Sequence, residues 1–404
     1  MPEPTAVTLA ELEADPHPAL ARLRAAGPVS WVPALGAWLV TGYRPALEVL
    51  RDARTFTVDD PRFSTAKVVG PSMLSLDGAQ HVRHRSPFTR PFRGDEVRAR
   101  LAAVTRAEAE RLVAAIRPQG EAELRRAVAG PLAVAVMAEA LGLADTDPAR
   151  ILAWYDGIVA AVQAETAAQA ETAAQAKAAA QAKAAAPAQV QTTAFAELAA
   201  SLREVIATQG GHSLLAEAAG EELLTENEVI SNAAVLMFGG IETTEGMIAN
   251  VMLHLLANPS ELSQVLADNA LVAKAVEESL RLEPAAAVVD RYATRDVRLA
   301  NASISKGDQV TVSIAGANRD PAVFGKPDTF DVRRPNAAKH LAFAHGPHFC
   351  LGAHLARLEA HTAVQTMLGR LPRLRLDPRY PAAPRGLVFR KPPDLHTCWT
   401  VSPG

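Results

Sequence analysis

One of the two cysteines in the chain lies in a segment rich in glycine, histidine and aromatic residues. Residues 343–352 read Phe-Ala-His-Gly-Pro-His-Phe-Cys-Leu-Gly, and a long amphipathic stretch follows at once. A cysteine at a helix N-terminus meets free N–H groups and the positive end of the helix dipole, which stabilise a thiolate. Gly346 and Gly352 would let the backbone approach the sulfur. Such a thiolate suits a haem iron; the alternative for Cys350 is a small buried side chain.

A second group of residues predicts a buried or surface ion pair. Glu278 and Arg281 are three residues apart and share one helix face, and Arg334 follows in the segment Phe-Asp-Val-Arg-Arg at 330–334. A solvated pair is the alternative interpretation and would contribute little. Cys398, in Leu-His-Thr-Cys-Trp-Thr, has no comparable surroundings and is interpreted as structural.

A third group lies inside an apolar stretch, Ala-Ala-Val-Leu-Met-Phe-Gly-Gly-Ile-Glu-Thr-Thr at 233–244. Each glycine in a helix costs about 1 kcal/mol relative to alanine, so Gly239 and Gly240 indicate close approach of something flat or a local kink. Glu242 and Thr243 follow directly and could rearrange backbone hydrogen bonds there. The alternative is a helix-packing contact with an incidental Glu-Thr pair.

A fourth group is the pair His81 and Arg85, four residues apart on one face of an expected helix. The two side chains could bind carboxylates, since an arginine fork matches a planar carboxylate. A solvated basic patch is the alternative.

Taken together, these motifs resemble the cytochromes P450 from about residue 35 to the C-terminus. Phe343, Gly346, His348, Cys350 and Gly352 match the family pattern Phe-x-x-Gly-x-His-x-Cys-x-Gly, while Ala344 stands where many members have glycine, a departure expected to matter little. The resemblance implies a haem b cofactor and assigns three sets of residues. The iron ligand is Cys350, and the other haem-binding residues are Phe343, Gly352, His81, Arg85, Arg291 and His348. Glu242 and Thr243 form the catalytic acid–alcohol pair, and Glu278, Arg281 and Arg334 are structural.

The resemblance also implies a substrate pocket, by analogy, at Ala234, Phe238, Gly239, Ala286, Val288 and Phe389. The expected reaction inserts one atom of O₂ into a small or medium-sized organic molecule, possibly a secondary metabolite. The alternatives are desaturation or oxidative coupling, a peroxide-driven variant, or a non-catalytic recruitment or gas-binding protein. Electrons would come from a separate ferredoxin and its reductase. The docking surface would comprise Arg83, Arg90, Arg93 and Arg357, unless these are ordinary surface charge.

The elements that must position these residues are mostly helices. Apolar spacing predicts helices over 97–117, 122–142, 194–208, 227–257 and 269–282, and strands over 31–41, 291–314 and 386–401. We therefore expect a mainly α fold with small β-sheets, the cytochrome P450 fold, as a single domain over residues 1–404. Four Ala-rich hexapeptides run from Ala164 to Pro187, and residues 164–193 are expected to form an insertion in the lid region.

Composition excludes some classes of function. The 404-residue chain is 49% hydrophobic with 5% aromatic residues and a net charge of −3, which argues against a nucleic-acid binder. The N-terminus lacks an apolar run that could insert into a membrane, so we expect a cytoplasmic protein with no membrane partner.

Overall fold

The computed structural model describes residues 7–176, 192–208 and 213–401. The α-helices in these ranges are α1 (Leu9–Ala14), α2 (Pro16–Ala26), α3 (Tyr43–Arg51), α4 (Ser64–Val69), α5 (Gly78–Thr89), α6 (Gly94–Ile116), α7 (Gly130–Leu141), α8 (Pro148–Ala176), α9 (Thr193–Thr208), α10 (Leu214–Gly220), α11 (Glu226–Ala257), α12 (Pro259–Ala267), α13 (Leu271–Leu282), α14 (Ile314–Ala317) and α15 (Ala353–Arg370). Helices thus dominate the described residues, as the sequence predicted.

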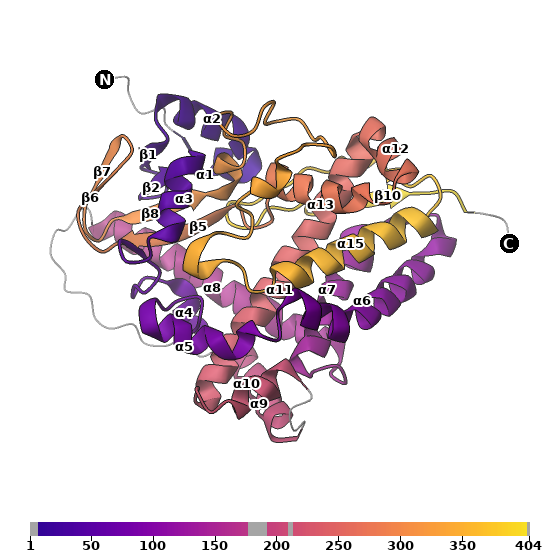
Figure 1. Cartoon of the computed structure of the whole chain (residues 1–404), viewed down its shortest axis with the longest axis horizontal. Coiled ribbons are helices and arrows are strands. Elements are labelled where there is room, and N and C mark those ends of the chain that lie inside the picture. The colour runs from indigo at the N-terminus through magenta and orange to yellow at the C-terminus, as the bar shows by residue number, and fades with distance from the viewer. Residues whose placement is uncertain (1–6, 177–191, 209–212, 402–404) are drawn as a thin grey trace.

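The strands are short and form small sheets at the edges of the helical body. They are β1 (Val29–Val32), β2 (Ala37–Val40), β3 (Phe56–Thr57), β4 (Glu121–Glu123), β5 (Val288–Ala293), β6 (Val297–Leu299), β7 (Ala302–Ile304), β8 (Gln309–Ser313), β9 (Arg375–Leu376) and β10 (His396–Cys398). The largest sheet has the order β1-β2-β8-β5-β3, in which only β2 and β8 pair in parallel. The other two sheets are β4-β10-β9 and the hairpin β6-β7. The sheet containing β5 and β8 gathers with α2 and α3 at one end of the molecule (Figure 1).

The central element is α11, which passes through the middle of the helical part (Figure 1). It starts at a capping box in which Thr225 and Glu228 satisfy each other's backbone N–H groups. Most of its residues are buried in the main apolar core, against helices that include α7, α13 and α15. A helix that is apolar on nearly all sides is stable only in such a buried position, so α11 has a fixed place around which the other site residues are arranged.

The predicted helix over 122–142 is partly wrong. The structure has strand β4 at Glu121–Glu123, then a π-helical turn over Arg125–Ala129, and only then α7. The backbone N–H of Leu124 donates to Leu395 O, a partner from the far end of the chain, which the local apolar spacing cannot reveal.

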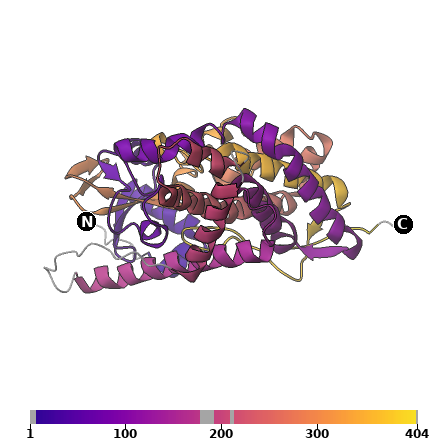
Figure 2. The same cartoon turned by 90° about the horizontal axis from the view of Figure 1, so that it is seen from below.

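Part of the Ala-rich tract belongs to α8. That helix continues to Ala176 and runs along one side of the molecule as the long magenta helix in Figure 2. The rest of the tract, residues 177–187, lies outside the described residues, as do residues 188–191 of the expected insertion. Among the described helices, none is both long enough and apolar enough to span a membrane.

Candidate active site

Cys350 lies in the loop just before α15. Gly352 caps the helix, and the backbone N–H of Cys350 donates to Phe343 O at 2.8 Å, which closes the loop. Burial raises the pKa of the Cys350 thiol, while the Gly352 N–H and the Arg85 and Arg357 guanidinium groups act to lower it. The expected helix-terminus hydrogen bond is therefore present, but desolvation outweighs it in the protein alone. A metal ion bound at this sulfur would add the positive charge that favours the thiolate.

Of the two glycines expected to bring backbone close to the sulfur, Gly352 does so and Gly346 does not. Gly346 has a φ of 72°, and a Cβ there would lie 2.5 Å from Leu50 O, so this glycine lets the loop approach α3 and not the sulfur. Ala344 also adopts a left-handed conformation, with a φ of 56°. Left-handed backbone costs an alanine roughly 1–2 kcal/mol and glycine much less. The departure at Ala344 from the glycine of many family members therefore has a physical cost.

Basic side chains from three elements meet beside this loop. His81 comes from α5, Arg291 from β5, and His348 from the Cys350 loop; all three are buried or nearly so. The rings of His81 and His348 have centroids 4.4 Å apart, and His348 Nε2 lies 2.7 Å from Asp77 Oδ1. No role was predicted for Asp77, the residue directly before α5.

Two of these basic groups have polar atoms that the protein does not satisfy. His81 Nε2 is buried without a hydrogen-bond partner, and burial lowers the pKa of His81 to about 4. Arg291 is 5% exposed, and its one hydrogen-bond partner among the described residues is a neighbouring backbone oxygen, Asp290 O, at 2.7 Å. Buried polar and charged groups in proteins normally have partners. An anionic ligand such as a haem propionate fits this cluster.

Arg85 reaches the same loop from α5. Its Nη2 donates to Phe349 O at 2.6 Å. His81 and Arg85 therefore share one helix face, and that face is turned toward the segment carrying Cys350.

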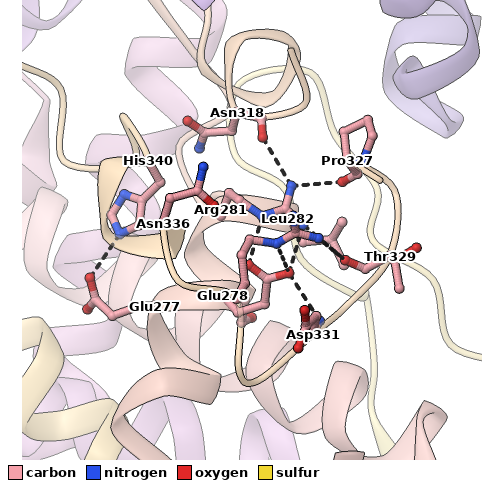
Figure 3. A network of polar contacts seen from close by, with 12 residues as sticks. Glu277, Glu278, Arg281, Leu282, Asn318, Pro327, Thr329, Asp331, Asn336 and His340 are labelled. Atoms are coloured by element: carbon pink, nitrogen blue, oxygen red, sulfur yellow. Dashed lines mark hydrogen bonds and ion pairs between the residues drawn. The ribbon is translucent and has the colours of Figure 1, made fainter. Parts of the chain in front are cut away.

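The second motif forms a closed, buried network (Figure 3). Arg281 donates to both Glu278 oxygens at 2.8 Å, and Arg334 Nε donates to Glu278 Oε1 at 2.9 Å. Glu278 and Arg281 are both fully buried. The remaining N–H groups of Arg281 donate to the backbone oxygens of Asn318, Pro327 and Thr329. This network ties α13 to the segment that leads into the Cys350 loop.

The central helix continues without a break past its two glycines. A Cβ on Gly240 would collide with Met137 Cε of α7, whereas a Cβ on Gly239 would meet no atom within 4 Å. Gly240 therefore allows helix packing, and Gly239 leaves an open helix face on which a flat group could lie. Next to it, the Thr243 hydroxyl donates to Gly239 O at 2.5 Å.

Glu242 belongs to a polar chain that sequence reasoning missed. Lys391 Nζ lies 2.9 Å from Glu242 Oε1, and the Tyr155 hydroxyl donates to Glu242 Oε2. Lys391 comes from the C-terminal turn and Tyr155 from α8, so neither is near Glu242 in the sequence. No sequence signal marks Tyr155, and Lys391 was visible only as part of the basic pair Arg390-Lys391.

The proposed pocket residues are only partly brought together. Phe238 and Phe389 pack edge to face with ring centroids 5.6 Å apart, and Ala286 forms a β-bridge with Phe389. Val288 begins β5 and is half-buried, as is Gly239. Ala234 is fully buried in the main core.

Helices α4 and α8 pack against each other, and an ion pair joins them. Lys67 Nζ on α4 lies 3.2 Å from Glu165 Oε2 on α8, with both side chains about four-fifths buried. Glu165 is in the first hexapeptide of the Ala-rich tract.

Two of the four surface arginines are already paired. Arg83 Nη1 donates to Glu228 Oε2 at 3.0 Å, and Arg357 Nε donates to Glu277 Oε1 at 2.6 Å. Arg90 is largely exposed and 3.8 Å from Glu96, and Arg93 is also exposed.

Comparison with known proteins identifies the family. The family model "Cytochrome P450" matches residues 31–381. The chain is 36% identical over 387 residues to the cytochrome P450 monooxygenase PikC of Streptomyces venezuelae, covering 91% of this chain and 86% of that protein. Two solved structures are similar at TM-scores of 0.84 and 0.78. They are CalO2, at 28% identity over 98% of this chain and 99% of that one, and HmtN, a post-tailoring hydroxylase involved in himastatin biosynthesis, at 29% identity over 98% and 100%. The mainly α fold with small sheets is thereby confirmed, and the chain belongs to the cytochrome P450 family of haem-dependent monooxygenases.

Proposed function

We propose that this P450 inserts one atom of O₂ into a small or medium-sized organic molecule of secondary metabolism, with electrons from a separate ferredoxin and its reductase. The monooxygenase activity is that of the family. The secondary-metabolite substrate is supported by similarity to HmtN, whose role is in himastatin biosynthesis. The cofactor we propose is haem b.

The observation that carries this proposal is the buried basic cluster beside the Cys350 loop. His81, Arg85, Arg291 and His348 would hold the haem propionates, since within the described part of the chain His81 Nε2 has no hydrogen-bond partner and the Arg291 guanidinium forms no ion pair with a carboxylate. Cys350 would bind the haem iron through its sulfur, with Phe343 and Gly352 shaping its loop. When bound, haem with a thiolate ligand supplies the redox chemistry that activates O₂. The three residues of the Glu278 network keep the loop in place.

Glu242 and Thr243 would manage protons next to the reacting oxygen. Thr243 is half-buried and its hydroxyl now donates to Gly239 O, so a rotation of that side chain redirects the proton toward the open face of the helix. Glu242 is the acid within the same helical turn and can pass protons on. The substrate would lie against Phe238, Gly239, Ala286, Val288 and Phe389. These side chains are apolar, which favours a ligand with few charged groups.

Residues 164–193 would be an insertion in the lid region, connecting the two lid helices α8 and α9. The ion pair of Lys67 with Glu165 supports this placement for the start of the tract. Arg90 and Arg93 would be the parts of the docking surface that remain available to an acidic ferredoxin, and such docking weakens at high salt.

The test of the haem site is the absorption spectrum of the dithionite-reduced protein with carbon monoxide. We expect a strongly red-shifted Soret band that disappears in Cys350→Ala and persists in Cys398→Ala, the matched control. A red-shifted band in Cys350→Ala would show that another group is the ligand. A wild-type protein that takes up no haem would instead favour the recruitment function.

The test of the acid–alcohol pair is the coupling of electron use to product. In Thr243→Ala we expect substrate binding to persist while more of the reducing equivalents are released as hydrogen peroxide. Thr244→Ala is the control, because Thr244 is buried on another side of α11. Unchanged coupling in Thr243→Ala would exclude a role in proton delivery.

A further inference from the structure

A chain of alternating charges crosses α11 next to the proposed acid. Arg125 Nε lies 2.8 Å from Glu245 Oε1, and Lys391 Nζ lies 2.5 Å from Glu245 Oε2. The same Lys391 Nζ is 2.9 Å from Glu242 Oε1, and the Tyr155 hydroxyl closes the chain at Glu242 Oε2. One ammonium group is therefore shared by two carboxylates.

The four elements that supply this chain meet only in the folded protein. Glu242 and Glu245 are three residues apart on one face of α11. Arg125 begins the π-helical turn, Tyr155 lies on α8, and Lys391 belongs to the C-terminal turn. A Cβ on Gly246 would lie 3.5 Å from Lys391 Cβ, an ordinary contact, which shows that the turn carrying Lys391 packs directly on this part of α11.

The charged groups of the chain are largely buried, which strengthens the electrostatic interactions between them. The side chains of Lys391, Glu242 and Glu245 are 14%, 12% and 10% exposed. Water therefore replaces a lost partner poorly, and a carboxylate that loses its cation there takes up a proton more readily. Among the described residues, Lys391 is the cation in contact with Glu242, and Tyr155 is its neutral donor.

Both oxygens of Glu242 are occupied by this chain. Neither bonds to Thr243, whose hydroxyl donates to Gly239 O instead. A carboxylate oxygen can accept more than one hydrogen bond, but a turn of the Glu242 carboxyl group toward Thr243 would lengthen its contact with Lys391 or with Tyr155. The hold on Glu242 also depends on a residue that does not touch it, because Arg125 competes with Lys391 for Glu245.

We propose that Lys391 is a positioning residue: its ion pair with Glu242 fixes the place of that carboxyl group and controls how easily it takes up and releases a proton. Arg125 affects this ion pair indirectly, because it shares Glu245 with Lys391. The inference rests on the proposed role of Glu242 as the acid. Tyr155 lies on α8, one of the two lid helices, so its hydrogen bond to Glu242 connects the lid to this chain of charges. Proton delivery would therefore respond to the position of the lid.

The experiment follows the protonation of Glu242 without turnover. The infrared carboxyl band that disappears in Glu242→Gln is titrated in the oxidised holoprotein without substrate, and the pH profile of coupling is measured alongside. We expect Lys391→Met to move the midpoint upward by about one pH unit or more. Lys391→Arg should restore the midpoint almost to that of the wild type. Arg125→Gln should move it upward by a smaller amount, because Lys391 is drawn to Glu245.

Arg126→Gln is the matched control, since Arg126 is the exposed neighbour of Arg125 in the same π-helical turn. Each variant must first show the thiolate-type carbon monoxide spectrum and a substrate-induced spin-state shift, which establishes that it is folded and loaded. An unmoved band in Lys391→Met, with coupling still altered by Glu242→Gln, would overturn this inference and leave the proposed function intact. An unmoved band in Arg125→Gln alone would overturn the part played through Glu245. Unaltered coupling in Glu242→Gln would remove the acid role itself.

Discussion

The Glu278 network and the Lys391 chain are both made of carboxylates and cations at helices, yet they differ in how their partners are divided. Glu278 is fully buried, and its two arginines have further backbone acceptors, so every charge is satisfied in one arrangement. In the Lys391 chain one ammonium group serves two carboxylates, and the side chains keep some contact with solvent.

The difference indicates what each network can do. A buried network with all its polar groups satisfied is rigid, because any rearrangement leaves a charge unpaired at low dielectric. Where two carboxylates share one cation, the cation can move closer to one of them at a small cost in free energy. The first arrangement suits the support of a cofactor loop, and the second suits a step in which a proton moves.

The largest expected effect is on the Glu278 network. Glu278→Gln removes the negative charge between Arg281 and Arg334, and we expect a loss of about 3–5 kcal/mol in the free energy of unfolding. Urea unfolding measures this loss. Glu277→Gln is the control, since Glu277 is adjacent but partly exposed and paired with Arg357. Equal losses in the two variants would remove the contrast between buried and partly exposed charge.

A pH dependence is expected at the contact between α11 and α13, which joins the helices of the two networks. His254 lies 2.9 Å from Ser279 Oγ through Nδ1, and burial lowers the pKa of His254 to about 4. The unfolded chain takes up this proton near pH 6.5, so stability falls as the pH is lowered from about 6.5 to 4, by roughly 3 kcal/mol in total. In His254→Gln this part of the pH dependence should vanish from the urea midpoints. A wild-type pH profile in that variant would mean that His254 takes up its proton at the same pH in the folded and the unfolded protein.

A smaller effect is expected where the Lys391 chain is cut. Lys391→Met should lower the free energy of unfolding by only about 1–2 kcal/mol. In this variant Glu245 would still contact Arg125, and Glu242 would still accept the hydrogen bond from Tyr155. Thermal unfolding of the same holoprotein measures it. A loss as large as that of Glu278→Gln would show that the two networks are equally rigid.

The smallest effect is a gain in the loop that the Glu278 network supports. Ala344→Gly should raise the free energy of unfolding by about 0.5–1 kcal/mol, because glycine adopts the left-handed backbone at this position more readily. Ala342→Gly is the control, since Ala342 has no positive φ, and it should lower stability. A loss in Ala344→Gly would mean that the loop relaxes around the alanine.

The long helices and the order of the motifs could be predicted from the sequence. The apolar stretch 227–257 became α11 at Glu226–Ala257, because a sustained buried pattern over that length fits little else. The position of Cys350 just before α15 could also be predicted, because a long amphipathic stretch begins directly after a loop that contains glycine.

The features that the sequence did not reveal depend on partners distant in the chain. The π-helical turn follows the pairing of Leu124 with Leu395, and Gly130 at its end would place a Cβ 3.3 Å from Glu245 Oε1. Tyr155 and Lys391 reach Glu242 only after α8 and the C-terminal turn have packed on α11. The left-handed conformation of Ala344 was equally hidden, since alanine gives no local sign of a positive φ.

The ion pair between Lys67 and Glu165 has a consequence for how the gene can vary. Glu165 is the second residue of the first of two identical hexapeptides, Ala-Glu-Thr-Ala-Ala-Gln. Loss of one copy by replication slippage would bring the second copy into its place, with glutamate again at position 165. The helix beyond would shorten by about 9 Å per copy. Natural selection could therefore change the length of this tract while inheriting the same contact between α4 and α8.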